Sequence, residues 1–220
     1  MMNDPRILEM NTRMQEYLLS YGPDRRLLLQ VIRHLAHGHP VTTEQVDRSI
    51  ADLGMAKEEV HQFLREVTER DAADQIVGAM GLSLSDHAHR LSVAGVTLAA
   101  WCALDTLFLP ALLGQTATIE SPSPVTHQQI WLRVSPQRVE EVTPTSAVVS
   151  VVLVDPSREN MASVEAIWGA FCNHSHFFAT REEGEQWATG RDDIVLLTVE
   201  EGFASERQVW SGVFPDLYAA

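Results

Sequence analysis

The chemistry that this sequence offers is concentrated in two cysteines and one aspartate. Cys102 and Asp105 stand three residues apart in the apolar segment 93–114, and Cys172 follows seventy residues after the first cysteine. Residues three apart on a helix project from the same face, so we expect the thiol of Cys102 and the carboxyl group of Asp105 to lie together. A thiolate is a nucleophile and a ligand for soft metal ions, and a neighbouring carboxyl group can transfer a proton.

The carboxyl group of Asp105 is expected among apolar side chains, because Leu98, Trp101, Leu109 and Leu112 share its face of the helix. An unpaired buried carboxylate is unfavourable, so such a group caps, pairs or reacts. Two interpretations are open from the residues alone. Either the pair is reactive, or it is a core cysteine beside an aspartate that bonds to the backbone or to an arginine.

A second group of candidate ligands surrounds the other cysteine. If this segment is extended, Cys172, His174 and His176 share one face of a strand, which would allow a Cys/His/His metal site. The spacing matches no common zinc signature and no fourth ligand is evident, so a buried cysteine followed by satisfied histidines is the alternative. Three further histidines near a predicted helix C-terminus fit the helix dipole and need no metal: His34, His37 and His39.

Composition and missing motifs exclude several classes of protein. With 16 Lys+Arg against 30 Asp+Glu, the net charge is −14, which repels phosphate backbones and anionic lipid, so we expect no nucleic-acid and no membrane partner. The chain has no Gly-rich phosphate loop and no G-x-S-x-G, H-E-x-x-H or CxxC motif. It begins without a basic region followed by an apolar run, and two cysteines make no disulfide framework. We therefore expect free thiols in the cytoplasm.

Segment 93–114 is long enough to span a bilayer, but its sequence argues against that role. Asp105 lies in its middle and Pro110 follows five residues later. A carboxylate at mid-bilayer costs roughly 3 kcal/mol. The segment is therefore interpreted as a strand that leads into a buried helix.

The remaining pattern predicts an α+β protein. Periodicity and capping residues predict helices over 4–21, 25–37, 43–53, 56–68, 98–113, 163–170, 181–189 and 200–210. Runs rich in Val, Ile and Thr predict strands over 76–80, 91–96, 116–120, 130–134, 147–154 and 194–199. We expect a helical, winged-helix-like N-terminal domain (1–85) packed on a catalytic domain (86–220), which has a mixed or antiparallel β core with flanking helices.

The winged-helix outline raises the question of DNA binding, and the charges answer it. Residues 1–90 hold 10 Lys+Arg and 14 Asp+Glu. The helix that would read the groove, 56–68, offers Lys57 and Arg65 against three glutamates. A groove-reading helix needs a basic footprint, so this sequence does not predict a DNA-binding protein.

Two segments resemble a known family. Residues 101–107, continuing through 110–112 and 114–117, closely resemble the catalytic segment of the organomercurial (alkylmercury) lyases. Phe171-Cys172, followed by His174 and 176–179, resembles the second cysteine motif of that family, in the same order. Weaker similarities at 38–41, 134–136, 185–188 and 201–203 extend the resemblance over most of the chain.

The resemblance implies an enzyme that cleaves the carbon–mercury bond of R–Hg⁺ to give RH and Hg(II). Its catalytic residues would be Cys102, Asp105 and Cys172, and the same three would form the site for substrate or product mercury. The two thiolates would bind the mercury and the aspartate would relay the proton. The family implies no organic cofactor, and cellular thiols or a mercuric reductase as acceptors of Hg(II). The alternative is a non-catalytic soft-metal (mercury or copper) binding or sensing protein on the same fold, which would gain little from a buried acid.

Two departures from the family pattern are visible, and one further assignment is open. Ser123 stands where many members have a third, structural cysteine, and Asn173 stands where some members have another cysteine. The second departure bears on how product mercury leaves. Trp101, Phe177 and Phe178 are candidates for an apolar wall around the organic group, although each, taken alone, is better explained as a core residue.

Overall fold

The computed structural model describes residues 4–22, 24–159 and 161–218, which form an α+β protein. Its N-terminal half begins with four helices, as predicted: α1 (Pro5–Ser20), α2 (Arg25–Leu35), α3 (Thr43–Leu53) and α4 (Lys57–Val67). Four more α-helices follow in the described residues: α5 (Asp105–Leu113), α6 (Val164–Ala170), α7 (Arg181–Trp187) and α8 (Val199–Val213). Short 3₁₀ helices span Cys172–His174 (η1) and Pro215–Leu217 (η2).

The first sheet is antiparallel throughout and has eight strands in the order β1-β2-β3-β5-β4-β6-β7-β8. Its strands are β1 (Thr68–Arg70), β2 (Ile76–Ala79), β3 (Leu82–Ser83), β4 (His89–Val93), β5 (Val96–Ala100), β6 (Ala117–Pro122), β7 (Gln129–Val134) and β8 (Val139–Thr143). Buried and exposed residues alternate along β6 and β7, so one face of the sheet packs on the core.

A second, three-stranded sheet has β9 (Val148–Val152) between β10 (Phe177–Phe178) and β11 (Ile194–Thr198). All five residues of β9 are buried, which explains why its sequence is apolar almost without interruption. The α+β fold class is thus confirmed. The winged-helix description and a domain boundary near residue 85 stay predictions, and the eight-stranded sheet takes strands from both sides of that residue.

The sequence prediction is wrong for the segment that carries the first cysteine. Residues 91–96 are not one strand, because β4 and β5 form a hairpin whose turn, at Ala94 and Gly95, has positive φ angles of 51° and 83°. The predicted helix 98–113 is also wrong at its start, since β5 continues to Ala100 and α5 begins at Asp105. A continuous apolar run has no period that separates a buried strand from a buried helix. The short strands β1, β3, β8 and β10 were not predicted.

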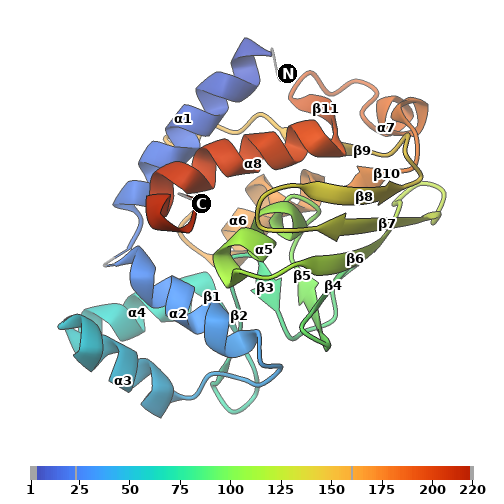
Figure 1. The fold of residues 1–220 in the computed structure, drawn as a ribbon. Helices are drawn as coiled ribbons and strands as arrows, with labels where there is room; N and C mark the ends of the chain where they lie inside the picture. Colours follow the sequence, from blue (N-terminus) through green and yellow to red (C-terminus); the bar gives the residue numbers. More distant parts are fainter. Residues whose placement is uncertain (1–3, 23, 160, 219–220) are drawn as a thin grey trace.

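The core helix α5 is buried from Asp105 to Leu112 and packs against α8, which in turn lies along α1 (Figure 1). The surroundings of α5 explain its uniformly apolar sequence, because a helix contacted on all sides needs no polar face. None of the helices among the described residues has the length and hydropathy that crossing a bilayer requires.

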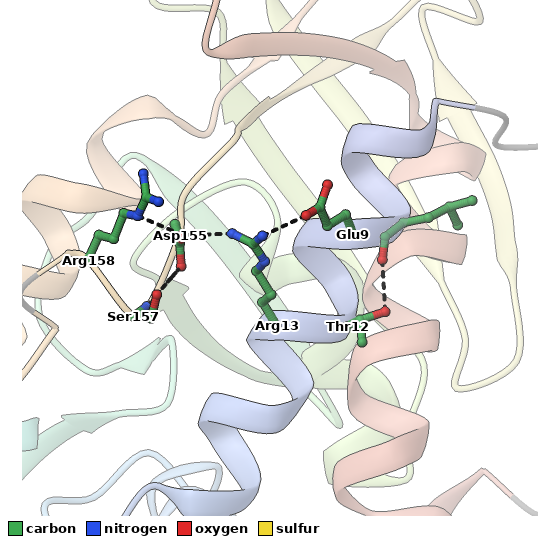
Figure 2. A network of polar contacts seen from close by, with 7 residues as sticks. Glu9, Thr12, Arg13, Asp155, Ser157 and Arg158 are labelled. Carbon is green, nitrogen blue, oxygen red and sulfur yellow. Dashed lines mark hydrogen bonds and ion pairs between the residues drawn. The ribbon is translucent and has the colours of Figure 1, made fainter.

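A polar contact outside the core fixes α1 to the loop that follows β9. Figure 2 shows Arg13 of α1 between Glu9 of the same helix and Asp155 of this loop, with N–O distances of 2.6 Å to each. Farther along α1, the hydroxyl group of Tyr17 donates a hydrogen bond to the backbone oxygen of Met161 (3.1 Å). Helix α1 and this loop therefore lie side by side, and Tyr17 and Met161 both line the cavity described below.

Candidate active site

Cys102, Asp105 and Cys172 come together in the interior of the protein. The two sulfur atoms and a carboxylate oxygen of Asp105 all lie within 4.8 Å of one another. The exposed fractions are 0% for Cys102, 6% for Asp105 and 4% for Cys172. Zinc–thiolate bonds are about 2.3 Å long, so two sulfurs this close can contact one soft ion from opposite sides.

The local geometry of the first cysteine differs from the predicted helical face. Cys102 lies in the turn between β5 and α5, and Asp105 is the first residue of α5. The backbone N–H of Cys102 donates a hydrogen bond to Oδ2 of Asp105 (2.8 Å). The carboxyl group thus closes the turn that presents the thiol, and its place in the first turn of α5 favours its charged form.

Ser175 joins the two cysteine segments. Its backbone oxygen accepts a hydrogen bond from the N–H of Ala103 (3.2 Å), and its Oγ accepts one from the N–H of Leu104 (3.1 Å). The N–H of Ser175 itself donates to the backbone oxygen of Cys172 (3.2 Å). One buried serine therefore holds the turn after Cys102 against the 3₁₀ turn that begins at Cys172.

Ser150 of β9 holds the same segment from the other side. Its N–H donates to the backbone oxygen of His176 (2.9 Å), and its Oγ donates to the backbone oxygen of His174 (2.8 Å). The N–H of His176 in turn donates to Oγ of Ser150 (2.9 Å). A small polar residue in the middle of an apolar strand is thus explained by the backbone groups that it satisfies.

Gly81 leaves the space that Asp105 occupies. Its φ angle is +84°, and a Cβ atom added there would lie 2.5 Å from Cγ of Asp105. The backbone oxygen of Gly81 also accepts a hydrogen bond from the N–H of Trp101 (2.9 Å). Both the backbone conformation and the close approach require glycine at this position.

Burial determines the protonation of the three groups. Burial, followed by contact with Cys172 and the charge of Asp105, raises the pKa of the Cys102 thiol well above its usual value. Interaction with Cys102 lowers the pKa of the Cys172 thiol, but burial and the charge of Asp105 outweigh it, so this pKa is raised too. Burial raises the pKa of Asp105 to about 6, against the hydrogen bonds with Cys102 that lower it. Near pH 7 the site therefore combines protonated thiols with a carboxylate that can accept a proton.

A largely apolar cavity of about 130 Å³ adjoins the site. Asp105 and Cys172 line it, whereas Cys102 is not part of its wall. A cavity of roughly 150 Å³ in another protein holds benzene, so an aryl or short alkyl group fits a space of this size. Most of the remaining wall is aromatic or aliphatic and includes Met10, Met14, Tyr17, Phe108, Phe171 and Trp210.

Of the three predicted wall residues, only Trp101 lines the cavity, and Phe177 and Phe178 are buried in β10 instead. The indole N–H of Trp101 donates a short hydrogen bond to Oε1 of Glu69. Oε2 of this glutamate accepts a hydrogen bond from the hydroxyl group of Ser83 (3.0 Å). Burial acts to raise the pKa of Glu69, but hydrogen bonds from His87 and Ser83 outweigh it and lower this pKa, so a carboxylate holds the Trp101 indole in the cavity wall.

Of the two interpretations left open for Cys172, His174 and His176, the described residues agree with the one that has no metal site. Cys172 begins a 3₁₀ turn rather than a strand, which separates its side chain from those of the two histidines. The Nδ1 of His174 pairs with Arg191 (3.0 Å), and Nε2 of His176 pairs with the backbone oxygen of Asn173 (3.0 Å). In the described residues, Cys102, Asp105 and Cys172 are the one group of three such side chains close enough to hold an ion. His34, His37 and His39 lie at the end of α2 or just after it.

The two departures from the family pattern lie outside the cavity wall. Ser123 is fully buried in the loop after β6, and its hydroxyl group donates a short hydrogen bond to Glu183. The backbone N–H of Ala179 donates to the other carboxylate oxygen of Glu183 (2.8 Å). Ser123 thus has a structural contact, whereas Asn173 is exposed in η1.

Several functional neighbours were missed from the sequence: Gly81, Ser150, Ser175, Glu69 and Glu206. The two serines interrupt apolar or aromatic segments, and that interruption was the available signal for a buried hydrogen-bonding role. Gly81 follows Met80, which also has a positive φ angle (47°), and no local pattern indicates that Asp105 packs against it.

Comparisons of sequence and of fold with known proteins point to one family. The family model for alkylmercury lyase matches residues 82–210. An alkylmercury lyase of Staphylococcus epidermidis is 40% identical over 83% of this chain and 81% of its own length, and one of Bacillus cereus is 37% identical over 80% and 77%. The crystal structure of the mercury-bound form of MerB2 superposes with a TM-score of 0.73 at 25% identity, covering 94% of this chain and 99% of that one. The chain belongs to the alkylmercury lyase family.

Proposed function

We propose that this protein is an organomercurial lyase that cleaves the carbon–mercury bond of R–Hg⁺ by protonolysis. The observation that carries the proposal is the meeting of two buried thiols and one carboxyl group within 4.8 Å. Mercury is a very soft cation, and thiolates are the ligands that soft metals prefer. The neighbouring apolar cavity accommodates the organic group.

In the proposed reaction, the two thiols lose their protons and the sulfurs of Cys102 and Cys172 bind mercury. The Asp105 carboxylate takes one of these protons, and the second leaves to solvent. The carbon–mercury bond then breaks, its electron pair forms a C–H bond with the proton from Asp105, and Hg(II) stays on the two sulfurs. Apolar surroundings strengthen the charge interactions that drive this transfer.

The pKa values of the three side chains support these proton transfers. Both thiol pKa values are raised and the pKa of Asp105 is about 6. The Asp105 carboxylate can therefore accept the proton that a thiol loses when mercury binds its sulfur. The reaction then needs no organic cofactor. Product Hg(II) would pass to cellular thiols or to a mercuric reductase in the cytoplasm, where thiol reductants keep the cysteines free.

The test is release of benzene from phenylmercury in the presence of excess small thiol, followed by gas chromatography. The wild type should release benzene, and Cys102→Ser and Cys172→Ser should each abolish turnover. Asp105→Asn should bind phenylmercury but release no benzene. Asp47→Asn is the matched control, because Asp47 is a surface carboxylate paired with Lys57 and His61, and its loss should leave turnover unchanged.

Near-normal benzene release from either cysteine variant would contradict the assignment of the two sulfurs. Unchanged turnover in Asp105→Asn would show that the proton comes from another group. A wild type that binds phenylmercury tightly and releases no benzene would instead favour a non-catalytic soft-metal binding protein.

A further inference from the structure

The cavity contains a second buried carboxyl group, that of Glu206 on α8. This residue is 9% exposed and lines the cavity together with Asp105. Its Oε2 accepts a hydrogen bond from the indole N–H of Trp210 (3.0 Å). Among the described residues, Trp210 is the one group seen to donate to the Glu206 side chain, and it donates to Oε2, so Oε1 is left for another donor.

The position of Glu206 is fixed relative to the reacting groups. Phe108 lies one turn after Asp105 on α5, and its ring stacks on that of Trp210 with a centroid distance of 4.3 Å. Trp210 stacks in turn on Phe214 (6.2 Å). The donor that orients the Glu206 carboxyl group is therefore itself held between two aromatic rings, and the two acids lie on helices in direct contact.

Most other polar side chains of the cavity wall have hydrogen-bond partners among the described residues. The hydroxyl groups of Tyr17 and Tyr21 both reach the backbone oxygen of Met161. The side chain of Asn11 bonds to Ser205 and Gln208 of α8, and the indole of Trp101 bonds to Glu69. Arg25 also lines the cavity, but it is an exposed residue beside Asp24. Oε1 of Glu206 is thus a side-chain oxygen in this largely apolar wall to which no group of the described residues donates.

We propose that Glu206 is a specificity residue that accepts a hydrogen bond from an amine or hydroxyl substituent on the organic group of the substrate. This inference rests on the proposed function and adds a substrate class to it: organomercurials whose organic group is uncharged and carries a hydrogen-bond donor. A carboxyl group offers an acceptor oxygen whether or not it is protonated. A site built to hydrogen-bond a substrate discriminates against an analogue of equal size that lacks the donor, because the buried acceptor is then left unpaired.

Two substrates of nearly equal size test the inference: 4-aminophenylmercury and 4-methylphenylmercury. The quantity measured is the ratio of their kcat/KM values, from release of aniline and of toluene with excess thiol. The substituent changes the intrinsic reactivity of the ring, and this effect is the same for every variant. Comparing the ratio between variants therefore isolates the contact between the substituent and residue 206.

Glu206→Leu should lower the preference for the amino substrate about fivefold, which corresponds to roughly one neutral hydrogen bond. Glu206→Gln keeps an acceptor oxygen and should retain most of the preference. Glu200→Leu is the matched control, since Glu200 is an exposed carboxylate on the same helix and does not line the cavity, and it should leave the ratio unchanged. Far-UV circular dichroism and turnover of the methyl substrate show that each variant is folded.

An equal ratio in the wild type and in folded, active Glu206→Leu would overturn the inference and leave the proposed function intact. Loss of the preference in Glu206→Gln to the same extent as in Glu206→Leu would also overturn it. If the wild type releases neither hydrocarbon, the proposed function fails, and the inference fails with it.

Discussion

Replacing Asp105 by asparagine should stabilise the free protein at alkaline pH while it removes activity. The carboxyl group is buried, and burial raises its pKa from 3.8 to about 6. Ionisation of this group therefore opposes folding. Asparagine has nearly the same size, carries no charge, and its carbonyl oxygen can still accept the hydrogen bond from the N–H of Cys102.

The magnitude follows from the pKa of Asp105. Its folded-state pKa lies above the unfolded value, so the stability that the protonated group contributes is fully present below about pH 3.8 and is lost as the pH rises through about 6. Each pKa unit is worth about 1.4 kcal/mol, so the loss reaches about 3 kcal/mol at pH 8. Because an amide does not titrate, Asp105→Asn should gain about 1 kcal/mol relative to wild type at pH 4.5 and about 3 kcal/mol at pH 8.

Urea unfolding followed by circular dichroism at these two pH values measures the effect. Asp47→Asn is again the control. Hydrogen bonds from Lys57 and His61 lower the pKa of this partly exposed carboxyl group, so its removal should give no gain in stability at pH 8. The reasoning is refuted if the stability difference between wild type and Asp105→Asn is the same at both pH values, or if the variant is the less stable protein at pH 8.

Three further variants test the framework around the site. Gly81→Ala should lose about 2 kcal/mol or more of stability and most of its turnover, because the added Cβ would collide with Asp105. A variant that is as stable as the wild type in urea unfolding and fully active in the benzene assay would contradict this. Ser175→Ala should cost about 1–3 kcal/mol in urea unfolding, because the N–H of Leu104 loses its acceptor, and wild-type stability would disprove that role. Arg13→Gln breaks the exposed pairs with Glu9 and Asp155 and should cost less than about 1 kcal/mol, whereas a loss of several kcal/mol would show that α1 depends on this contact far more than exposed pairs allow.

The elements that have a clear period or clear capping residues were predictable from the sequence. Helix α3 begins with the capping box of Thr42 and Gln45 and ends at Gly54 in the left-handed conformation, as its residues indicate. The segment around Cys102 has no such signals. Its apolar residues are buried on both sides, first in a hairpin and then in α5, so periodicity could not locate the boundary between strand and helix.

The residues of the candidate site were predictable from the sequence, but the contacts that bring them together were not. The resemblance named Cys102, Asp105 and Cys172, and the structure brings these three side chains together. Their roles in catalysis stay predictions. The contacts that assemble them, through Ser175 and Gly81, join residues far apart in the chain, and only the tertiary structure determines such contacts.

The most direct test of the account is the coordination of product mercury in the wild-type protein. X-ray absorption spectroscopy on the protein with one equivalent of Hg(II), without free thiol, counts the sulfur atoms bound to each mercury. The account predicts one ion per chain with two sulfur ligands, falling to one protein sulfur in Cys102→Ser and in Cys172→Ser. Mercury bound by a single protein sulfur in the wild type, as in either cysteine variant, would contradict it.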